Sequence, residues 1–372
     1  LLVDGKILCQ EATNVSFYRY FVEDGELKVN AIGDEVWPAQ KEVLKWQMQE
    51  IYDSKGYDPE PMYIYFTEGN HSITLDYVDQ PIAIRSVVLN GKKEIPSYEQ
   101  VQQQYEQKGY KVANKESMRY FEAEKSLWRN DSIIRRESNS DPKTVPFSLT
   151  SRKLNTLGGG RWNRGEQSVS WEFEVQEDGL YQIGLKVLQN KDAGMPAYRK
   201  IEIDGSVPFR EFLEYEFPYS KEWYGEVLSG KDGEALLVYL EKGVHELTLT
   251  AQIGPLATVI EKTMHDISAL SDITRDIIKI TGTDPDPNYE YELYRRMPEL
   301  SGELQTLADS VETCEKILAS ISNRQTSSEN NYRQIVDTLR NFVEDVDRIP
   351  KALNELESAQ SSLGTYITSL EK

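Results

Sequence analysis

Two segments of the chain, 174 positions apart, follow the same pattern, and this repeat limits the folds that the chain can adopt. Residues 60–77 and 234–251 are identical at six of 18 aligned positions. Each copy has the form of a strand, a Gly-x-His turn and a second strand, with His71 matching His245. A repeat that contains a whole hairpin predicts two related β-domains. A histidine at the same turn of both copies is better explained by architecture than by catalysis.

Short stretches in which apolar and polar residues alternate precede the second hairpin. Val169–Val175 and Leu180–Leu188 both alternate, and Glu-Asp-Gly between them is a turn signal. Many short strands at regular spacing are typical of a β-sandwich. Because only 59 residues precede the first hairpin, we expect the first sandwich to be incomplete at its N-terminus.

The composition changes near residue 254, where the β-pattern ends. All six tryptophans and 20 of the 23 glycines lie at or before Gly254. Beyond it, apolar residues recur at steps of three and four, as in Leu300, Leu304, Leu307 and Val311. This is the spacing of one face of a helix. Breaks at 281–287, 323–331 and 349–350 divide the region into about four helices, which predicts an antiparallel bundle.

A short helix is predicted between the two β-regions. Ile95–Gly109 begins with Pro and a Ser cap, continues with helix formers and ends at Gly. The predicted fold class is therefore multidomain α and β, with two jelly-roll-like antiparallel β-sandwiches followed by an antiparallel α-helical bundle. The expected boundaries are 1–92 for the first sandwich, 93–113 for the linker helix, 114–254 for the second sandwich and 255–372 for the bundle.

The charge of the chain excludes two classes of partner. It has 42 Lys and Arg against 62 Asp and Glu, a formal net charge of −20. Proteins bind nucleic acids and anionic lipid surfaces largely through their own positive charges, so neither is expected as a partner of this acidic chain. No run approaches the roughly 18 apolar residues of a membrane span, so direct membrane insertion is not expected either.

The common catalytic signatures are missing from the sequence. The chain has only two cysteines, Cys9 and Cys314, and three histidines, and it contains no H-E-x-x-H, G-x-S-x-G, Walker or G-x-G-x-x-G motif. We therefore do not expect an enzyme.

Two glutamates at the start of the predicted second sandwich are candidate metal ligands. Glu122 and Glu124 lie in the run Tyr-Phe-Glu-Ala-Glu. In an edge strand they would point to the same face, about 7 Å apart, where they could share calcium. The alternative is a pair of solvated carboxylates with no metal.

A glycine-rich loop and several aromatic residues are candidates for sugar binding. Gly158–Gly165 contains Arg161 and Trp162, and a flat indole can cover the apolar face of a sugar ring. Tyr198, Trp223 and Trp128 are further aromatic candidates. The alternative is that Trp162 closes one end of the sandwich and the others are packing residues.

At this point the sequence resembles known families. The run Gly160-Arg-Trp-Asn-Arg-Gly-Glu-Gln-Ser-Val-Ser-Trp, preceded by Phe121-Glu-Ala-Glu, resembles carbohydrate-binding modules of the family 6/35 kind. Tyr198-Arg-Lys-Ile-Glu-Ile-Asp-Gly, Ile280-Thr-Gly-Thr-Asp-Pro and Gly56-Tyr-Asp-Pro-Glu-Pro resemble the N-terminal region of large solute-binding lipoproteins of Gram-positive ABC sugar importers. This second resemblance covers nearly the whole chain.

The resemblance implies a function and a location. It implies a non-catalytic, extracellular region at the cell surface, lipid-anchored in the full-length protein, with the transported solute captured by a downstream domain. Permease subunits of the importer and an oligosaccharide or polysaccharide are the implied partners. Calcium at Glu122 and Glu124, and sugar at Trp162, are the implied site assignments.

Two alternatives stay open beside glycan binding by the second sandwich. The sandwiches and bundle could be a structural spacer that presents the solute-binding domain. A fragment of a glycoside hydrolase is less favoured, because no catalytic domain of adequate size remains once the sandwiches and bundle are assigned.

Overall fold

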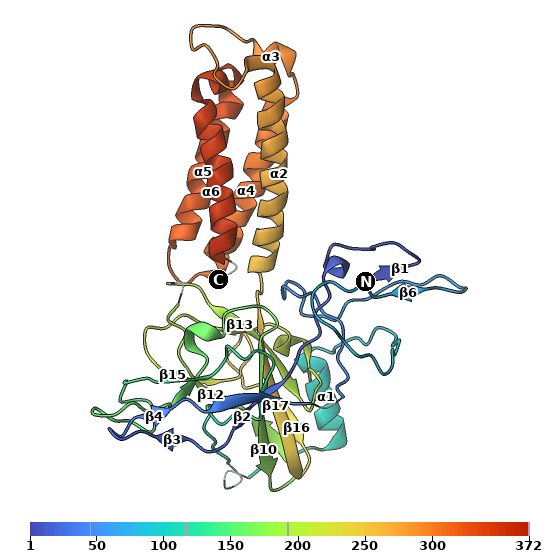
Figure 1. Cartoon of the computed structure of the whole chain (residues 1–372), viewed down its shortest axis with the longest axis vertical. Helices are drawn as coiled ribbons and strands as arrows, with labels where there is room; N and C mark the ends of the chain where they lie inside the picture. Colours follow the sequence, from blue (N-terminus) through green and yellow to red (C-terminus); the bar gives the residue numbers. More distant parts are fainter. Residues whose placement is uncertain (45, 115, 117, 192, 371–372) are drawn as a thin grey trace. The chain divides into compact units, whose positions relative to one another are not determined.

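The structure is a computed structural model, and it describes residues 1–44, 46–114, 116, 118–191 and 193–370. The chain divides into two compact units. We call residues 1–189 and 197–252 the β-unit, and residues 190–196 and 253–372 the helical unit. The β-unit contains the strands, α1 and three short 3₁₀-helices, and the helical unit contains the remaining helices of the described residues (Figure 1).

A seven-stranded antiparallel sheet forms one layer of the β-unit. Its strands are, in order, β14 (Tyr215–Phe217), β13 (Ala197–Ile203), β17 (Gly243–Gln252), β10 (Ser168–Val175), β7 (Trp128–Arg129), β2 (Phe21–Asp24) and β5 (Ala39–Glu42). Alternation along β10 places Val169, Trp171 and Val175 in the core.

The facing layer is made of two antiparallel strand pairs. They are β11 (Gly179–Gln182) with β16 (Leu237–Leu240), and β12 (Gly184–Val187) with β15 (Tyr224–Val227). Val238 and Leu240 of β16 share one apolar core with Trp171 and Ile201 of the large sheet. The two layers therefore form a β-sandwich, as predicted.

Three smaller strand pairs, one α-helix and three short 3₁₀-helices complete the β-unit among the described residues. The strand pairs are β1 (Leu2–Val3) with β6 (Ile73–Thr74), β3 (Lys28–Val29) with β4 (Glu35–Val36), and β8 (Arg136–Glu137) with β9 (Thr156–Leu157). The 3₁₀-helices are η1 (Glu11–Thr13), η3 (Gly159–Arg161) and η4 (Arg210–Phe212). Helix α1 (Tyr98–Lys108) begins at a Ser97 capping box and ends at Gly109 with φ 68°, as its sequence predicted.

The predicted repeat is present at the level of individual hydrogen bonds. In the first copy, His71 Nδ1 lies 2.8 Å from Asp4 Oδ2, and its Nε2 lies 2.8 Å from the Thr67 carbonyl oxygen. In the second copy, His245 Nδ1 lies 2.7 Å from Asp204 Oδ2. Asp4 and Asp204 have nearly the same left-handed φ, 50° and 51°, and each precedes a glycine. The repeated histidines therefore fasten an Asp-Gly turn to the hairpin, which is an architectural role.

The predicted boundaries within the β-unit need correction. β2 and β5 lie within residues 1–92, yet they extend the sheet of residues 114–254, because Phe21 pairs with Arg129 of β7. Helix α1 is more than a linker, since Val101 is part of the sandwich core and the Leu237 amide donates to Tyr98 Oη at 3.0 Å. The first 92 residues therefore do not form a domain of their own.

The helical unit contains four long helices that lie side by side, as predicted (Figure 1). They are α2 (Leu256–Thr281), α4 (Leu300–Ile321), α5 (Ser327–Glu344) and α6 (Leu353–Leu370), with the short α3 (Leu293–Arg296) and the 3₁₀-helix η5 (Val346–Ala352) between them. The predicted apolar stripes are buried, including Leu304, Val311, Leu339 and Leu356. Among the described residues, no helix is both long and apolar enough to cross a membrane.

Candidate functional site

Trp162, the central residue of the predicted sugar site, is held in place by its neighbours. It follows η3 and packs against the sandwich core, and its Nε1 donates to the Gln167 carbonyl oxygen at 2.8 Å. The Arg199 guanidinium lies 4.6 Å from the indole centroid, and burial lowers the pKa of Arg199 to about 10, so it stays charged at neutral pH. A sugar stacking on the indole face beneath Arg199 would have to displace that cation.

The other predicted sugar-binding residues near the start and the middle of the sandwich have partners of their own or are buried. Tyr198 is buried and precedes Arg199 in β13, so the two side chains point to opposite faces of the sheet. Trp128 donates from Nε1 to Glu246 Oε1 at 2.8 Å. Arg161 donates to Glu137 Oε1 at 2.6 Å.

Trp223 directly precedes β15. Its Nε1 is buried, with no hydrogen-bond partner among the described residues.

The two candidate metal ligands lie in a turn, where the sequence predicted an edge strand. The Lys125 amide donates to the Glu122 carbonyl oxygen at 3.0 Å, which closes the turn around Glu124. Glu122 is exposed and Glu124 is buried. Burial, together with the negative charge of Glu122, raises the pKa of Glu124. Within the described part of the chain, no three His, Cys, Asp or Glu side chains are arranged to hold a metal ion.

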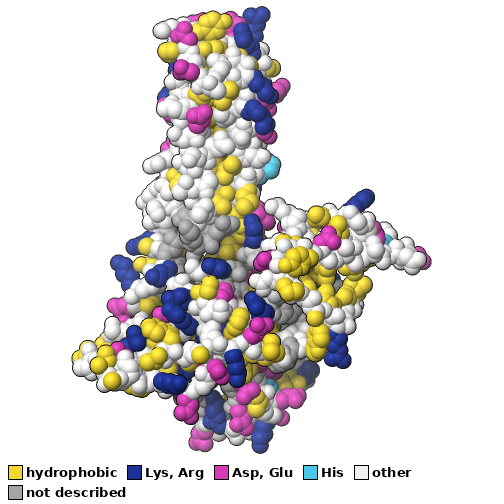
Figure 2. Space-filling view, viewed as in Figure 1, with side chains coloured by type: hydrophobic (Ala, Val, Ile, Leu, Met, Phe, Trp, Pro, Cys, Tyr) yellow, Lys and Arg dark blue, Asp and Glu magenta, His cyan; other side chains and the backbone are white. Residues whose placement is uncertain are grey.

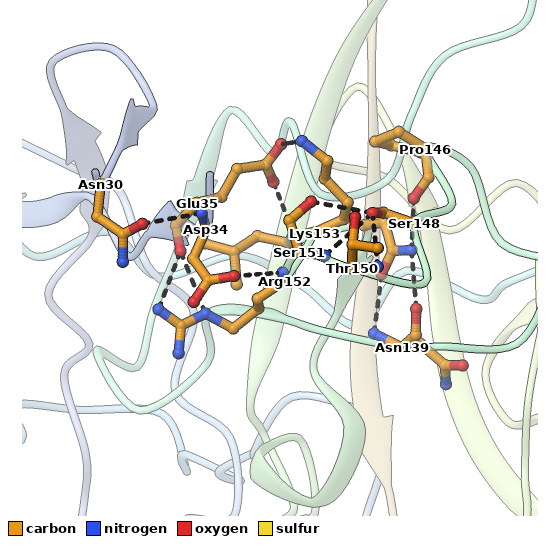
Figure 3. Close-up of polar contacts among 12 residues, drawn as sticks. Asn30, Asp34, Glu35, Asn139, Pro146, Ser148, Thr150, Ser151, Arg152 and Lys153 are labelled. Carbon is orange, nitrogen blue, oxygen red and sulfur yellow. Dashed lines mark hydrogen bonds and ion pairs between the residues drawn. The ribbon is translucent and has the colours of Figure 1, made fainter. Parts of the chain in front are cut away.

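A polar network fixes the loop of residues 148–154 to the β3–β4 hairpin (Figure 3). Glu35 is buried; its carboxylate accepts from Lys153 Nζ at 3.2 Å and from the Leu154 amide at 2.7 Å. Its carbonyl oxygen accepts from Arg152 Nη2 at 3.1 Å, and Asp34 Oδ1 accepts from the Arg152 amide at 2.6 Å. Because Glu35 finds its partners within the chain, this network serves to position the loop.

Two arginines approach Trp37 beside this network. The Arg152 guanidinium carbon lies 4.3 Å from the ring centroid, and that of Arg135 lies 5.2 Å from it. The indole Nε1 donates to the Arg136 carbonyl oxygen at 2.9 Å. Trp37 is thus another tryptophan whose polar atom and ring are engaged within the chain.

Trp46 is the most exposed tryptophan of the chain, and no pattern in the sequence marked it as a candidate. Its relative exposure is 62%, and Leu44 and Met48 at alternate positions are exposed as well. The segment is anchored from the other side, because Gln49 Nε2 donates to the Tyr18 carbonyl oxygen at 2.6 Å and Gln49 Oε1 accepts from the Tyr18 amide at 2.8 Å. We call Leu44, Trp46 and Met48 the Trp46 ridge, and it offers an open apolar surface to a ligand.

Comparison with known proteins connects the helical unit to one family. Residues 258–371 match the family described as bacterial solute-binding protein, 4-helix bundle domain. No match to a curated protein was found for the chain.

Several solved structures resemble part of the chain at low similarity. A cycloisomaltooligosaccharide glucanotransferase of Paenibacillus sp., complexed with cycloisomaltoheptaose, is 16% identical, with a TM-score of 0.26 over 43% of this chain and 21% of that one. A family 35 carbohydrate-binding module from Clostridium thermocellum is 13% identical, with a TM-score of 0.26 over 35% of this chain and 83% of that one. A GH26-CBM35 β-(1,4)-mannanase of Podospora anserina is 12% identical, with a TM-score of 0.24 over 35% of this chain and 23% of that one. The chain thus spans about a fifth of the two enzymes, and likenesses this weak carry no argument about its ligand.

Proposed function

We propose that the chain is a non-catalytic accessory region of an extracellular solute-binding protein that serves a bacterial ABC sugar importer. The match of residues 258–371 to a bacterial solute-binding protein bundle carries this proposal. The full-length protein would be lipid-anchored at the cell surface of a Gram-positive bacterium. The helical unit would then connect the β-unit to the domain that captures the solute.

The structural role is the first candidate for the β-unit. Trp162 and Trp37 are engaged by arginines and backbone atoms, which supports a scaffold better than an open loop site.

Chemical cross-linking of the full-length protein in its native membranes tests the importer assignment. We expect cross-links to the permease subunits of an importer, and their absence while other importers in the same membranes give theirs would contradict the assignment.

Glycan binding at the Trp46 ridge is the second candidate, favoured by the exposure of that side chain. An exposed indole can cover a sugar ring, and Leu44 and Met48 extend its apolar surface. A glycan array followed by calorimetric titration tests this. Binding that is lost in Trp46→Ala and kept in Tyr289→Ala, an exposed aromatic residue of the helical unit, supports the ridge as the site.

Other outcomes of the titration separate the candidates. Glycan binding that is kept in Trp46→Ala and lost in Trp162→Ala would indicate that the site lies in the loop of residues 158–165. The absence of saturable binding to every glycan would leave the scaffold role alone. Release of reducing sugar from any oligosaccharide would contradict the non-catalytic assignment.

Calcium binding at Glu122 and Glu124 remains a proposal of its own. Glu124 is buried, and its pKa is raised by burial and by the neighbouring carboxylate, so a cation would relieve an unfavourable charge. A thermal-unfolding scan with calcium and with chelator tests it. We expect calcium to raise the thermal-unfolding midpoint of the unchanged chain and to leave the midpoint of the Glu124→Gln variant as it is. Equal midpoints of the unchanged chain with calcium and with chelator would contradict the proposal.

A further inference from the structure

The two copies of the repeat differ in how their hairpins are covered. In the second copy, β17 pairs with β13 along one edge and with β10 along the other. In the first copy, β6 takes the place of β17 and β1 takes the place of the end of β13. Within the described residues, β6 has no strand on its other edge. The edge that β10 occupies in the second copy is therefore open in the first.

The inner face of the first hairpin is exposed in the same way. Ile73 is 39% exposed, whereas Leu247, its counterpart in the second copy, is 3% exposed. Tyr77 is 73% exposed, and its counterpart Ala251 is 4% exposed. Hydrophobic side chains gather over β1, β6 and the loops beside them (Figure 2). Exposed apolar side chains that lie together on one face mark a candidate interaction surface.

A cavity beside β1 lies where the second copy has its core. It has a volume of about 330 Å³, and its lining includes Val3, Cys9, Ala12, Met62 and Ile64. Their counterparts at offsets of 200 and 174 positions are core residues, namely Ile203, Phe209, Phe212, Leu236 and Val238. Cys9 and Ala12 thus stand where the second copy has two phenylalanines. The first copy has room for a large side chain from another segment.

We propose that the free edge of β6 and this cavity accept an antiparallel β-strand from a protein partner. The second copy defines the chemistry of that strand. Trp171 of β10 lies opposite Leu247, so the incoming strand places an aromatic residue opposite Ile73, where it can fill the cavity. Ser168 lies opposite Thr250, whose counterpart is the exposed Asp76, so a basic residue is complementary there.

A labelled peptide with the sequence of residues 167–176 and the change Ser168→Lys is the probe. We expect it to bind the full chain saturably in fluorescence anisotropy. Replacing Trp171 of the peptide by Ala, or Ile73 of the chain by Asp, should weaken binding by at least about tenfold. Val244→Asp, at an exposed position on β17, is the matched control and should leave binding unchanged. Hydrogen exchange should become slower at the amides of residues 73–76 when the peptide binds.

Three results would overturn the proposal. The first is no saturable binding at millimolar peptide by a chain whose circular dichroism is native. The second is binding that Ile73→Asp does not weaken. The third is a dimer of the chain that forms without peptide and is dissociated by Ile73→Asp, because a second copy would then occupy the face.

Discussion

Replacing Glu23 by Ala tests whether the first 92 residues are part of the second sandwich. Glu23 of β2 accepts from Arg129 Nη2 at 3.1 Å and from Arg136 Nη2 at 2.7 Å, and the Arg129 side chain is fully buried. Removing the carboxylate leaves a buried guanidinium without its counterion. Removing one partner of a buried ion pair lowers the free energy of unfolding by about 3–5 kcal/mol. We therefore expect Glu23→Ala to lower the free energy of unfolding of the β-unit by about that amount.

Urea unfolding followed by tryptophan fluorescence measures this loss in the β-unit alone, because all six tryptophans lie at or before residue 223. Circular dichroism at the helical band follows the helical unit in the same samples. Glu42→Ala is the matched control, since Glu42 pairs with Arg19 at 3.6 Å on the surface, where a pair contributes about 0–1 kcal/mol. Equal losses in Glu23→Ala and Glu42→Ala would refute the placement of β2 in this sheet.

Three further predictions concern close packing and titration. Gly165→Ala should destabilise the β-unit by about 1–3 kcal/mol, because a Cβ there would overlap the Lys55 carbonyl, whereas Gly160→Ala meets no atom within 4 Å and should be nearly neutral in urea unfolding. Burial lowers the pKa of His245, but the hydrogen bonds of the ring to the Glu241 carbonyl and to Asp204 outweigh burial, so the pKa is raised overall. The stability that protonated His245 contributes should be present below about pH 6.5 and be lost as pH rises through the folded-state pKa. His245→Gln should lack this dependence of the free energy of unfolding on pH. Burial raises the pKa of Asp266, so the folded helical unit binds this proton more tightly than the unfolded chain does. The helical unit should therefore gain stability as pH falls through the folded-state pKa of Asp266, and Asp266→Asn should remove this pH dependence in circular dichroism melts.

The sequence predicted the parts of the fold that depend on local signals. The 3.6-residue period of Leu304, Val311 and Leu339 marked the buried faces of the bundle, and Ser97 and Gly109 marked the ends of α1. The Gly-x-His repeat identified a structural unit, because the positive φ at its glycine is fixed by the turn itself. The aspartate that each histidine contacts lies 67 positions away in the first copy and 41 in the second, so this contact was not encoded locally.

Features that depend on long-range contacts could not be predicted. The pairing of Phe21 with Arg129 joins segments more than 100 positions apart, and no local pattern encodes it. Glu122 and Glu124 have the spacing of one strand face, but the chain turns between them. Trp46 lies in an alternating segment, and alternation does not tell which face is outward. Here the glutamine face is anchored by Gln49 and the apolar face is exposed.

Uptake of labelled oligosaccharides by the native host tests the proposed role most directly. The comparison is between cells with the intact gene, cells without it, and deleted cells that carry the gene again. We predict that uptake of at least one oligosaccharide is lost with the gene and restored with it, while no sugar is hydrolysed by the purified chain. Unchanged uptake of the whole panel in the deleted cells would contradict the assignment to a sugar importer.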